Sequence, residues 1–202
     1  MKIIGLCGGS GSGKGAVCSI FRENGIPTID TDAVYRDLTG GPGPLINELK
    51  REFGSSIITT DGALNRRALA EIVFSSENSK EKLRRLNQLA HKFILDETRE
   101  ILNRHSAHGA MLGVVDAPVL FESAFDAECD MIVSVIADRE IRIGRIMARD
   151  SITRLDAESR IASQMSDEEL ISRSDFVIYN NGDLDQLRCR VNAIIEELNQ
   201  KI

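Results

Sequence analysis

Seven residues near the start of the chain have the types and spacing of a phosphate-binding loop, Gly8-Gly9-Ser10-Gly11-Ser12-Gly13-Lys14. The apolar run Ile3-Ile4-Gly5-Leu6-Cys7 precedes them, and the helical pattern Ala16-Val17-x-x-Ile20-Phe21 follows. A loop that wraps a triphosphate must turn backbone N–H groups inward, and glycine adopts the positive φ angles that this requires. The next helix adds partial positive charge, and the lysine reaches the β- and γ-phosphates. A plain flexible loop would not need strand, helix and lysine in this register, so the pattern predicts a nucleotide site.

The residue after the lysine departs from the usual form of this motif. That position is normally Ser or Thr, whose hydroxyl binds Mg²⁺, but here it is Gly15, followed by Ala16. Because Mg²⁺ keeps several waters in most sites, a water can fill the place of the hydroxyl. We therefore predict a bound nucleotide with Mg²⁺ and leave the protein ligands of the metal open.

Composition narrows the class of protein. The chain has 202 residues, 42% of them hydrophobic and 28% charged, with a net charge of −6, which fits one soluble domain with a sizeable core. The acidic balance disfavours a general binder of nucleic acid or anionic membrane, and no apolar run approaches the roughly 18 residues of a membrane span. No signal peptide is visible, and the four cysteines lack metal-ligand spacing. We expect free thiols and a cytoplasmic protein.

Two carboxylates close the predicted second strand, residues 27–30, in the segment Asp30-Thr31-Asp32. Ligands of a parallel α/β sheet bind where its strands end, so these carboxylates suggest a base for a substrate hydroxyl. From its position alone, Asp32 is about as well placed to cap the following helix as to act as this base. The two roles are compatible.

A segment rich in glycine and proline, residues 39–44, predicts a loop after which the chain leaves the sheet for a helical insertion. Helices are predicted over residues 45–49, 64–74 and 79–103. Arg66 and Arg67 lie near the start of the second of these, where cations oppose the helix dipole. That conflict hints at function, although a solvated basic pair is the alternative. His91 lies at the edge of the apolar stripe of the third helix, where a structural role is the commoner one.

Three more strands are predicted, over residues 111–116, 131–136 and 175–178, with a final helix over residues 184–198. The first of these strands ends in Asp116, a carboxylate that could hold Mg²⁺ through water or act on the substrate side. A helix after the second, capped by Asp138, carries Arg142, Arg145 and Arg149 on one face. Such a face is usually solvated surface, but arginines above a phosphate site can neutralise a transferred phosphoryl group. Residues 153–164 and a capping box at Ser166 predict further helices.

Taken in order, these motifs resemble the dephospho-CoA kinase family over nearly the whole chain, residues 2 to about 198. The matching segments are Gly8 with the loop through Lys14, Ile29-Asp30-Thr31-Asp32, Leu64-x-Arg66-Arg67, Pro118-Val119-Leu120-Phe121-Glu122, Arg145-x-x-x-Arg149-Asp150 and Asn180-Asn181-Gly182. Three positions depart from the family's pattern: Lys92 replaces a proline after His91, Val119 a leucine, and Tyr179 an aspartate.

The resemblance implies an α/β fold of the P-loop NTPase type, a five-stranded parallel sheet between layers of helices. A single domain, residues 1–202, would have its core at about 1–38, 108–138 and 174–202. The helical substrate-binding insertion would cover about 39–107 and a helical lid about 139–173.

The resemblance also implies transfer of the γ-phosphoryl group of ATP, with Mg²⁺, to the 3′-hydroxyl of the dephospho-CoA ribose. Asp32 would be the catalytic base, Lys14 would hold the β- and γ-phosphates, and Arg149 would stabilise the transition state. The residues predicted to bind ATP are Gly8, Gly9, Ser10, Gly11, Ser12, Gly13, Lys14, Gly15, Ala16, Arg145, Arg149, Asn180, Asn181 and Gly182. Those predicted to bind the second substrate are Asp32, Tyr35, Arg66, Arg67, His91, Pro118, Leu120, Phe121 and Glu122, with Asp116 as the candidate metal ligand.

We expect a monomer, with weak self-association as the alternative. We also expect a small-molecule substrate and no nucleic-acid or membrane partner. One alternative is another small-molecule P-loop kinase, acting on a nucleotide, shikimate or gluconate. The other is a non-catalytic nucleotide-binding module. The sequence lacks the Asn-Lys-x-Asp guanine motif, which disfavours a GTPase switch.

Overall fold

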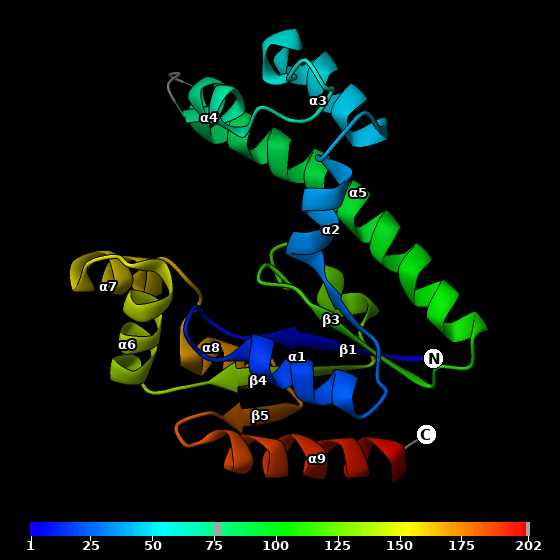
Figure 1. Ribbon diagram of the computed structural model, residues 1–202, viewed down its shortest axis with the longest axis vertical. Helices are drawn as coiled ribbons and strands as arrows, with labels where there is room; N and C mark the ends of the chain where they lie inside the picture. Colours follow the sequence, from blue (N-terminus) through cyan, green and yellow to red (C-terminus); the bar gives the residue numbers. More distant parts are fainter. Residues whose placement is uncertain (75–77, 201–202) are drawn as a thin grey trace. The chain divides into compact units, whose positions relative to one another are not determined.

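The computed structural model describes residues 1–74 and 78–200 and divides into two compact units (Figure 1). One unit is formed by Met1–Ile29 together with Arg104–Ile202, and the other by Asp30–Asn103. The predicted domain and its insertion also include residues 75–77 and 201–202, which lie outside the described residues. The boundaries predicted for core, insertion and lid stay predictions.

The first unit is built on a five-stranded sheet in the order β2-β3-β1-β4-β5. Its strands are β1 (Lys2–Cys7), β2 (Thr28–Asp30), β3 (Leu112–Asp116), β4 (Met131–Ile136) and β5 (Phe176–Tyr179). β1 runs parallel to both β3 and β4, and β4 runs parallel to β5. The carboxyl ends of these strands therefore share one edge, and the glycine loop leaves β1 at that edge. The predicted parallel α/β sheet is confirmed.

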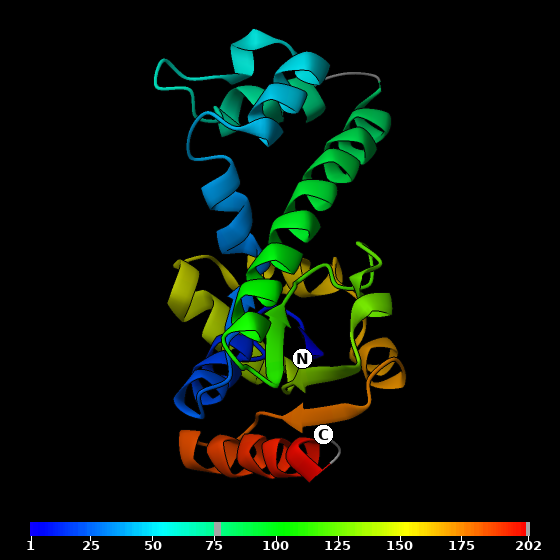
Figure 2. The same ribbon diagram turned by 90° about the vertical axis from the view of Figure 1, so that its right-hand side faces the viewer.

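Side chains alternate along each strand, and in β1 this alternation places helices on both faces of the sheet. Ile4 and Leu6 are buried in a core with α1 (Lys14–Glu23) and α9 (Leu184–Gln200). Gly5 faces the other side, where an added Cβ would lie 2.9 Å from Leu120. On that side Ser134 of β4 donates to the carbonyl of Leu170 in α8 (Asp167–Ser172) at 3.2 Å. These contacts give the predicted three layers, which can be followed in Figure 2.

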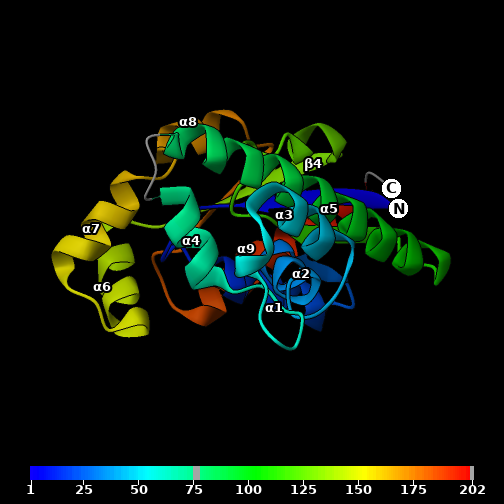
Figure 3. The same ribbon diagram turned by 90° about the horizontal axis from the view of Figure 1, so that it is seen from above.

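Two helices of the predicted lid, α6 (Arg139–Asp150) and α7 (Arg154–Ala162), lie side by side (Figure 3). Their shared buried core is small and consists of Ile143, Ile146 and Ala157. Thr153 begins α7 in a capping box with Asp156. The pair is therefore a short helical hairpin with its own apolar contact.

The second unit is helical. It contains α2 (Thr31–Leu38), α3 (Pro44–Phe53), the short η1 (Ser55–Ile57), α4 (Arg66–Phe74) and the part of α5 (Ser79–Ala107) up to residue 103. Its core gathers around Leu45, Leu49, Ile57 and Val73. The helices predicted here are confirmed, with α3 and α5 extending beyond their predicted ends. Among the helices of the described residues, none has the length and apolar character needed to span a membrane.

Asp30, and not Asp32, caps α2. The Oδ1 atom of Asp30 accepts the N–H groups of Asp32 at 2.9 Å and of Ala33 at 3.1 Å. Asp30 ends β2 in an extended conformation, as an N-cap residue must, whereas Asp32 is already the second residue of the helix. The predicted capping role of Asp32 is therefore wrong, and its exposed carboxylate is left to another function.

Replacing Asp30 with Ala removes the acceptor for these two helical N–H groups. We expect the free energy of unfolding to fall by about 1 kcal/mol, measured by urea denaturation. Asp37→Ala, which removes an exposed carboxylate later in the same helix, is the matched control. An equal loss of stability in both variants would contradict the capping assignment.

Candidate active site

The loop between β1 and α1 has a backbone that only glycine accommodates at several positions. Gly8, Gly11 and Gly13 have φ angles of 148°, 77° and 98°, in the region that favours glycine. Space is limiting as well. An added Cβ would lie 2.4 Å from the carbonyl oxygen of Val135 at Gly8 and 2.1 Å from Asn180 Nδ2 at Gly13. The positive φ angles that the motif predicts are therefore present.

Lys14 is folded back over this loop. Its Nζ donates to the carbonyl of Gly8 at 3.1 Å and lies 3.8 Å from Asp116 Oδ1. The sheet register pairs Leu6 with Asp116, which places the carboxylate that ends β3 beside the start of the loop. A lysine ammonium and a carboxylate therefore lie close together beside this loop.

A further side chain contacts Asp116 from α1. Cys18 Sγ donates to Asp116 Oδ2 at 3.6 Å. Burial, reinforced by the charge of Asp116, raises the pKa of the Cys18 thiol to about 12, so it stays protonated and able to donate. Cys18 is not among the residues predicted from the sequence, although its spacing of four from Lys14 places both on one face of the helix.

The residue after Lys14 offers no side chain to a metal ion. Gly15 lies in the exposed first turn of α1, and a Cβ there would meet no atom within 4 Å. Residues 1–74 and 78–200 contain no group of three His, Cys, Asp or Glu side chains that could hold a metal ion. Asp116 is the carboxylate beside Lys14 at this loop, and its role as a metal ligand stays a prediction.

The three arginines of α6 differ in what they contact. Arg142 is buried, and its Nε donates to the carbonyl of Ser10 at 2.9 Å. Arg145 Nη1 donates to the carbonyls of Gly11 at 3.2 Å and Ser12 at 3.4 Å. The side chain of Arg149 is 60% exposed and pairs with its neighbour Asp150. Arg142 and Arg145 therefore hydrogen-bond to the backbone of the phosphate loop, whereas Arg149 pairs with a carboxylate of its own helix.

Arg149 is engaged by a carboxylate. Its Nε and Nη2 donate to Asp150 at 2.8 and 2.9 Å. Hydrogen bonds from Arg149 and then from Arg160 lower the pKa of Asp150 to about 2, so Asp150 stays charged at neutral pH. Arg149 must exchange this partner before it can meet a phosphoryl group, and its predicted role stays a prediction.

The two asparagines after β5 connect later parts of the chain to the loop. Asn180 is buried, and its Nδ2 donates to the carbonyl of Ser12 at 2.7 Å. Asn181 accepts the N–H of Asp138 at 2.8 Å and donates to the carboxylate of Asp138 at 2.7 Å. Asp138 occupies the N-cap position of α6, but its side chain caps no helical N–H. The predicted side-chain cap at Asp138 is therefore wrong, because Asn181 holds that carboxylate.

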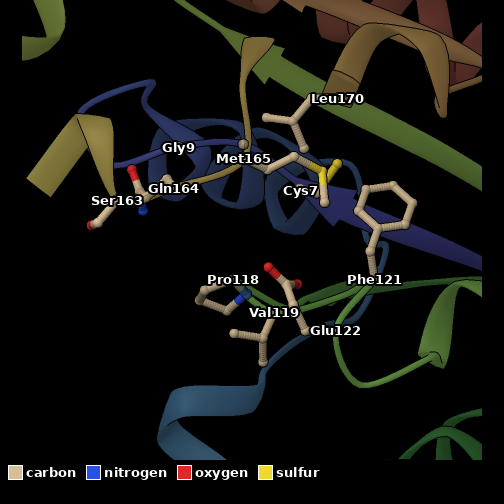
Figure 4. Close-up of a pocket in the computed structure, with 11 residues that line it drawn as sticks. Cys7, Gly9, Pro118, Val119, Phe121, Glu122, Ser163, Gln164, Met165 and Leu170 are labelled. Atoms are coloured by element: carbon tan, nitrogen blue, oxygen red, sulfur yellow. The ribbon is translucent and has the colours of Figure 1, made fainter. Parts of the chain in front are cut away.

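A cavity of about 190 Å³ lies beside the phosphate loop. Figure 4 shows Gly9 and Gln164 together on one side of it, with Pro118 and Glu122 on the other. Phe121 also lines the cavity, and the guanidinium of Arg173 lies 5.1 Å from the centre of its ring. Three of the predicted substrate residues thus line one cavity.

Leu120 is not among the residues that line this cavity. It is 1% exposed and packs against Gly5 beneath the sheet. The predicted contact of Leu120 with substrate is therefore replaced by a place in the core, because the turn that follows β3 buries Leu120 and leaves Pro118 and Val119 exposed.

The remaining predicted substrate residues belong to the second unit. The guanidinium of Arg66 lies 5.5 Å from the centre of the Tyr35 ring, and its Nη2 donates to Thr39 Oγ1 at 3.2 Å. Arg67 has a 90% exposed side chain and pairs with Glu71 at 3.1 Å. His91 is half-buried in α5. The basic pair is thus divided, with Arg66 held against Tyr35 and Arg67 in solvent.

Comparison with known proteins agrees with this geometry. The family model for dephospho-CoA kinase matches residues 2–186. A dephospho-CoA kinase of Corynebacterium glutamicum is 35% identical over 202 residues, covering 100% of both chains. A crystal structure from Thermus thermophilus has a TM-score of 0.77 at 33% identity, covering 98% of this chain and 97% of that one. A dephospho-CoA kinase from Campylobacter jejuni shares the fold with a TM-score of 0.72 at 23% identity, covering 100% of this chain and 99% of that one. The chain therefore belongs to the dephospho-CoA kinase family.

Proposed function

We infer that this chain transfers the γ-phosphoryl group of ATP to the 3′-hydroxyl of dephospho-CoA, giving coenzyme A and ADP, the final step of coenzyme A synthesis. The observation that carries this inference is the family match over residues 2–186, combined with a phosphate loop whose Gly8 and Gly13 have no room for a side chain.

We further propose a cytoplasmic monomer without nucleic-acid or membrane partners. The four free cysteines are in keeping with a reducing compartment.

The phosphates of ATP bind to the loop and to Lys14. In the structure the ammonium of Lys14 donates to the carbonyl of Gly8. A phosphate oxygen is a stronger acceptor because the hydrogen bond then joins two charges. Asn181 and Gly182 lie near the nucleotide, and Arg145 adds a positive charge beside the loop. Mg²⁺, when bound, would neutralise charge on the phosphates of ATP, and Asp116 would hold it through water.

Asp32 accepts the proton of the substrate hydroxyl. Its carboxylate is exposed, and the capping of α2 is performed by Asp30. As the hydroxyl oxygen forms its bond to the γ-phosphorus, the bond from that phosphorus to the β,γ-bridging oxygen breaks, and ADP leaves. Arg149, released from Asp150, balances the charge on the transferred group as the lid closes and excludes water.

Dephospho-CoA offers a diphosphate and a long pantetheine arm. Arg66, held beside the Tyr35 ring, suits the diphosphate because a guanidinium binds phosphate oxygens in pairs. Arg67 contributes after it releases Glu71, and His91 is a further contact. Pro118, Phe121 and Glu122 bind the remainder of the substrate.

Asp32→Asn removes the proposed base without changing the size of the side chain. We expect kcat to fall by about 10²- to 10⁴-fold, with nucleotide affinity unchanged, in a coupled assay of ADP release. Asp37→Asn, an exposed carboxylate of the same helix, is the matched control and should retain wild-type kcat. A variant at position 32 that is fully active would exclude Asp32 as the base.

The substrate assignment is tested by ADP release with Mg²⁺ in the presence of dephospho-CoA, AMP, CMP, shikimate or gluconate. We expect turnover with dephospho-CoA alone, because only that acceptor carries the groups for which the second unit is suited. Turnover with another acceptor would keep the phosphate site and overturn the substrate. Tight ATP binding without any turnover would favour the binding-module alternative.

A further inference from the structure

Ser10, the third residue of the phosphate loop, is held on both sides by side chains from distant parts of the chain. Its backbone N–H donates to Gln164 Oε1 at 2.9 Å, and its carbonyl accepts from Arg142 Nε at 2.9 Å. Its hydroxyl accepts from Gln164 Nε2 at 3.2 Å. Together with Asp167, which pairs with Arg142, these side chains form what we call the Ser10 clamp. Every polar group of Ser10 is engaged by the clamp.

Arg142 is the centre of the clamp. Its side chain is only 5% exposed, and its Nη1 lies 2.9 Å from Asp167 Oδ1. Its Nη2 donates to Gln164 Oε1 at 3.3 Å. A guanidinium is costly to bury unless it is both paired and hydrogen-bonded. Here a carboxylate, an amide oxygen and a backbone carbonyl meet that need, so the side chain has one well-determined position.

The glycines on either side of Ser10 admit this arginine. An added Cβ on Gly9 would lie 2.1 Å from Arg142 Nη2, and one on Gly11 would lie 2.7 Å from the Arg142 carbonyl oxygen. Gly9 is not among the glycines with positive φ. Its missing side chain is therefore explained by the approach of Arg142 and not by backbone conformation.

We propose that the Ser10 clamp is a positioning device, in which Arg142 and Gln164 set the peptide groups around Ser10 and so orient the loop for phosphate. Arg142 does this as a buried support for the loop and makes no contact with phosphate itself. Because the Ser10 N–H is used by Gln164, phosphate binds through the N–H groups that follow. Gln164 lies in the segment between α7 and α8, and Asp167 is the first residue of α8, so the clamp also connects the geometry of the phosphate loop to the proposed lid. Its effect on phosphoryl transfer rests on the proposed function, whereas its effect on the loop does not.

Gln164→Met tests the clamp, because methionine keeps the length of the side chain and removes both the acceptor and the donor. In the protein without nucleotide, we expect hydrogen exchange of the Ser10 amide to accelerate by about tenfold or more. We also expect kcat/KM for ATP to fall by about 10- to 100-fold, because small errors in position are costly in transfer reactions. Gln88→Met, an exposed glutamine of α5, is the matched control for both measurements.

Gln164→Glu separates the hydrogen bond from simple packing. Glutamate keeps an oxygen that accepts from Ser10 and Arg142, so the Ser10 amide should stay protected. Loss of protection equal to that of Gln164→Met would overturn the proposed hydrogen bond, as would unchanged exchange in Gln164→Met. Faster exchange with wild-type kcat/KM would overturn the positioning role. If the wild-type enzyme fails to phosphorylate dephospho-CoA, the proposed function fails, and amide exchange still decides whether the clamp exists.

Discussion

The phosphate loop can turn its N–H groups toward an anion only if the carbonyls of the same peptides are satisfied elsewhere. Three successive carbonyls are satisfied in this way: that of Ser10 by Arg142, that of Gly11 by Arg145, and that of Ser12 by Arg145 and Asn180. The donors come from α6 and from the segment after β5, far from the loop in the sequence. The parallel sheet brings them together because β4 and β5, which precede them, end at the same edge as β1. Much of the first unit thus supports one backbone conformation.

The two parts of the first unit, the sheet and the α6–α7 hairpin, differ in how much apolar core stabilises them. The sheet is covered by a large apolar core, whereas α6 and α7 share only a small one. Elements with few buried contacts open at lower free-energy cost than a central core, which is in keeping with the proposal that these two helices form a lid over ATP. Arg142 ties the base of this hairpin to the loop. Arg149, further along α6, is exposed and paired with Asp150. The first turn of α6 is therefore held to the loop, and its last turn is not held there by Arg149.

Much of this could be predicted from local patterns. Local patterns predict the glycine loop around Lys14, the strands from their apolar runs, and the helices from apolar residues spaced by three and four. Those predictions hold because each of these features depends on residues that are neighbours in the sequence. The errors and omissions depend on tertiary contacts. Leu120 is a core residue because it fills the space beside Gly5, and the carboxylate of Asp138 is held by Asn181. Gln164 meets Ser10 across 154 positions of sequence, a separation that no periodicity reveals. Asp30 caps α2 because β2 ends at that residue, and the exact ends of strands and helices are what sequence patterns predict least accurately.

We expect nucleotide binding to depend on the backbone of this loop, and the glycines on either side of Lys14 offer a test of that dependence. Gly13 has a φ of 98° and no room for a Cβ, whereas Gly15 faces open space. The measurement is the Kd for ATP by titration calorimetry on folded Gly13→Ala and Gly15→Ala. We expect about 10- to 100-fold weaker binding for Gly13→Ala, from the strain of a left-handed alanine, and affinity close to wild type for Gly15→Ala. Equal affinities in the two variants would show that nucleotide binding does not depend on this backbone conformation.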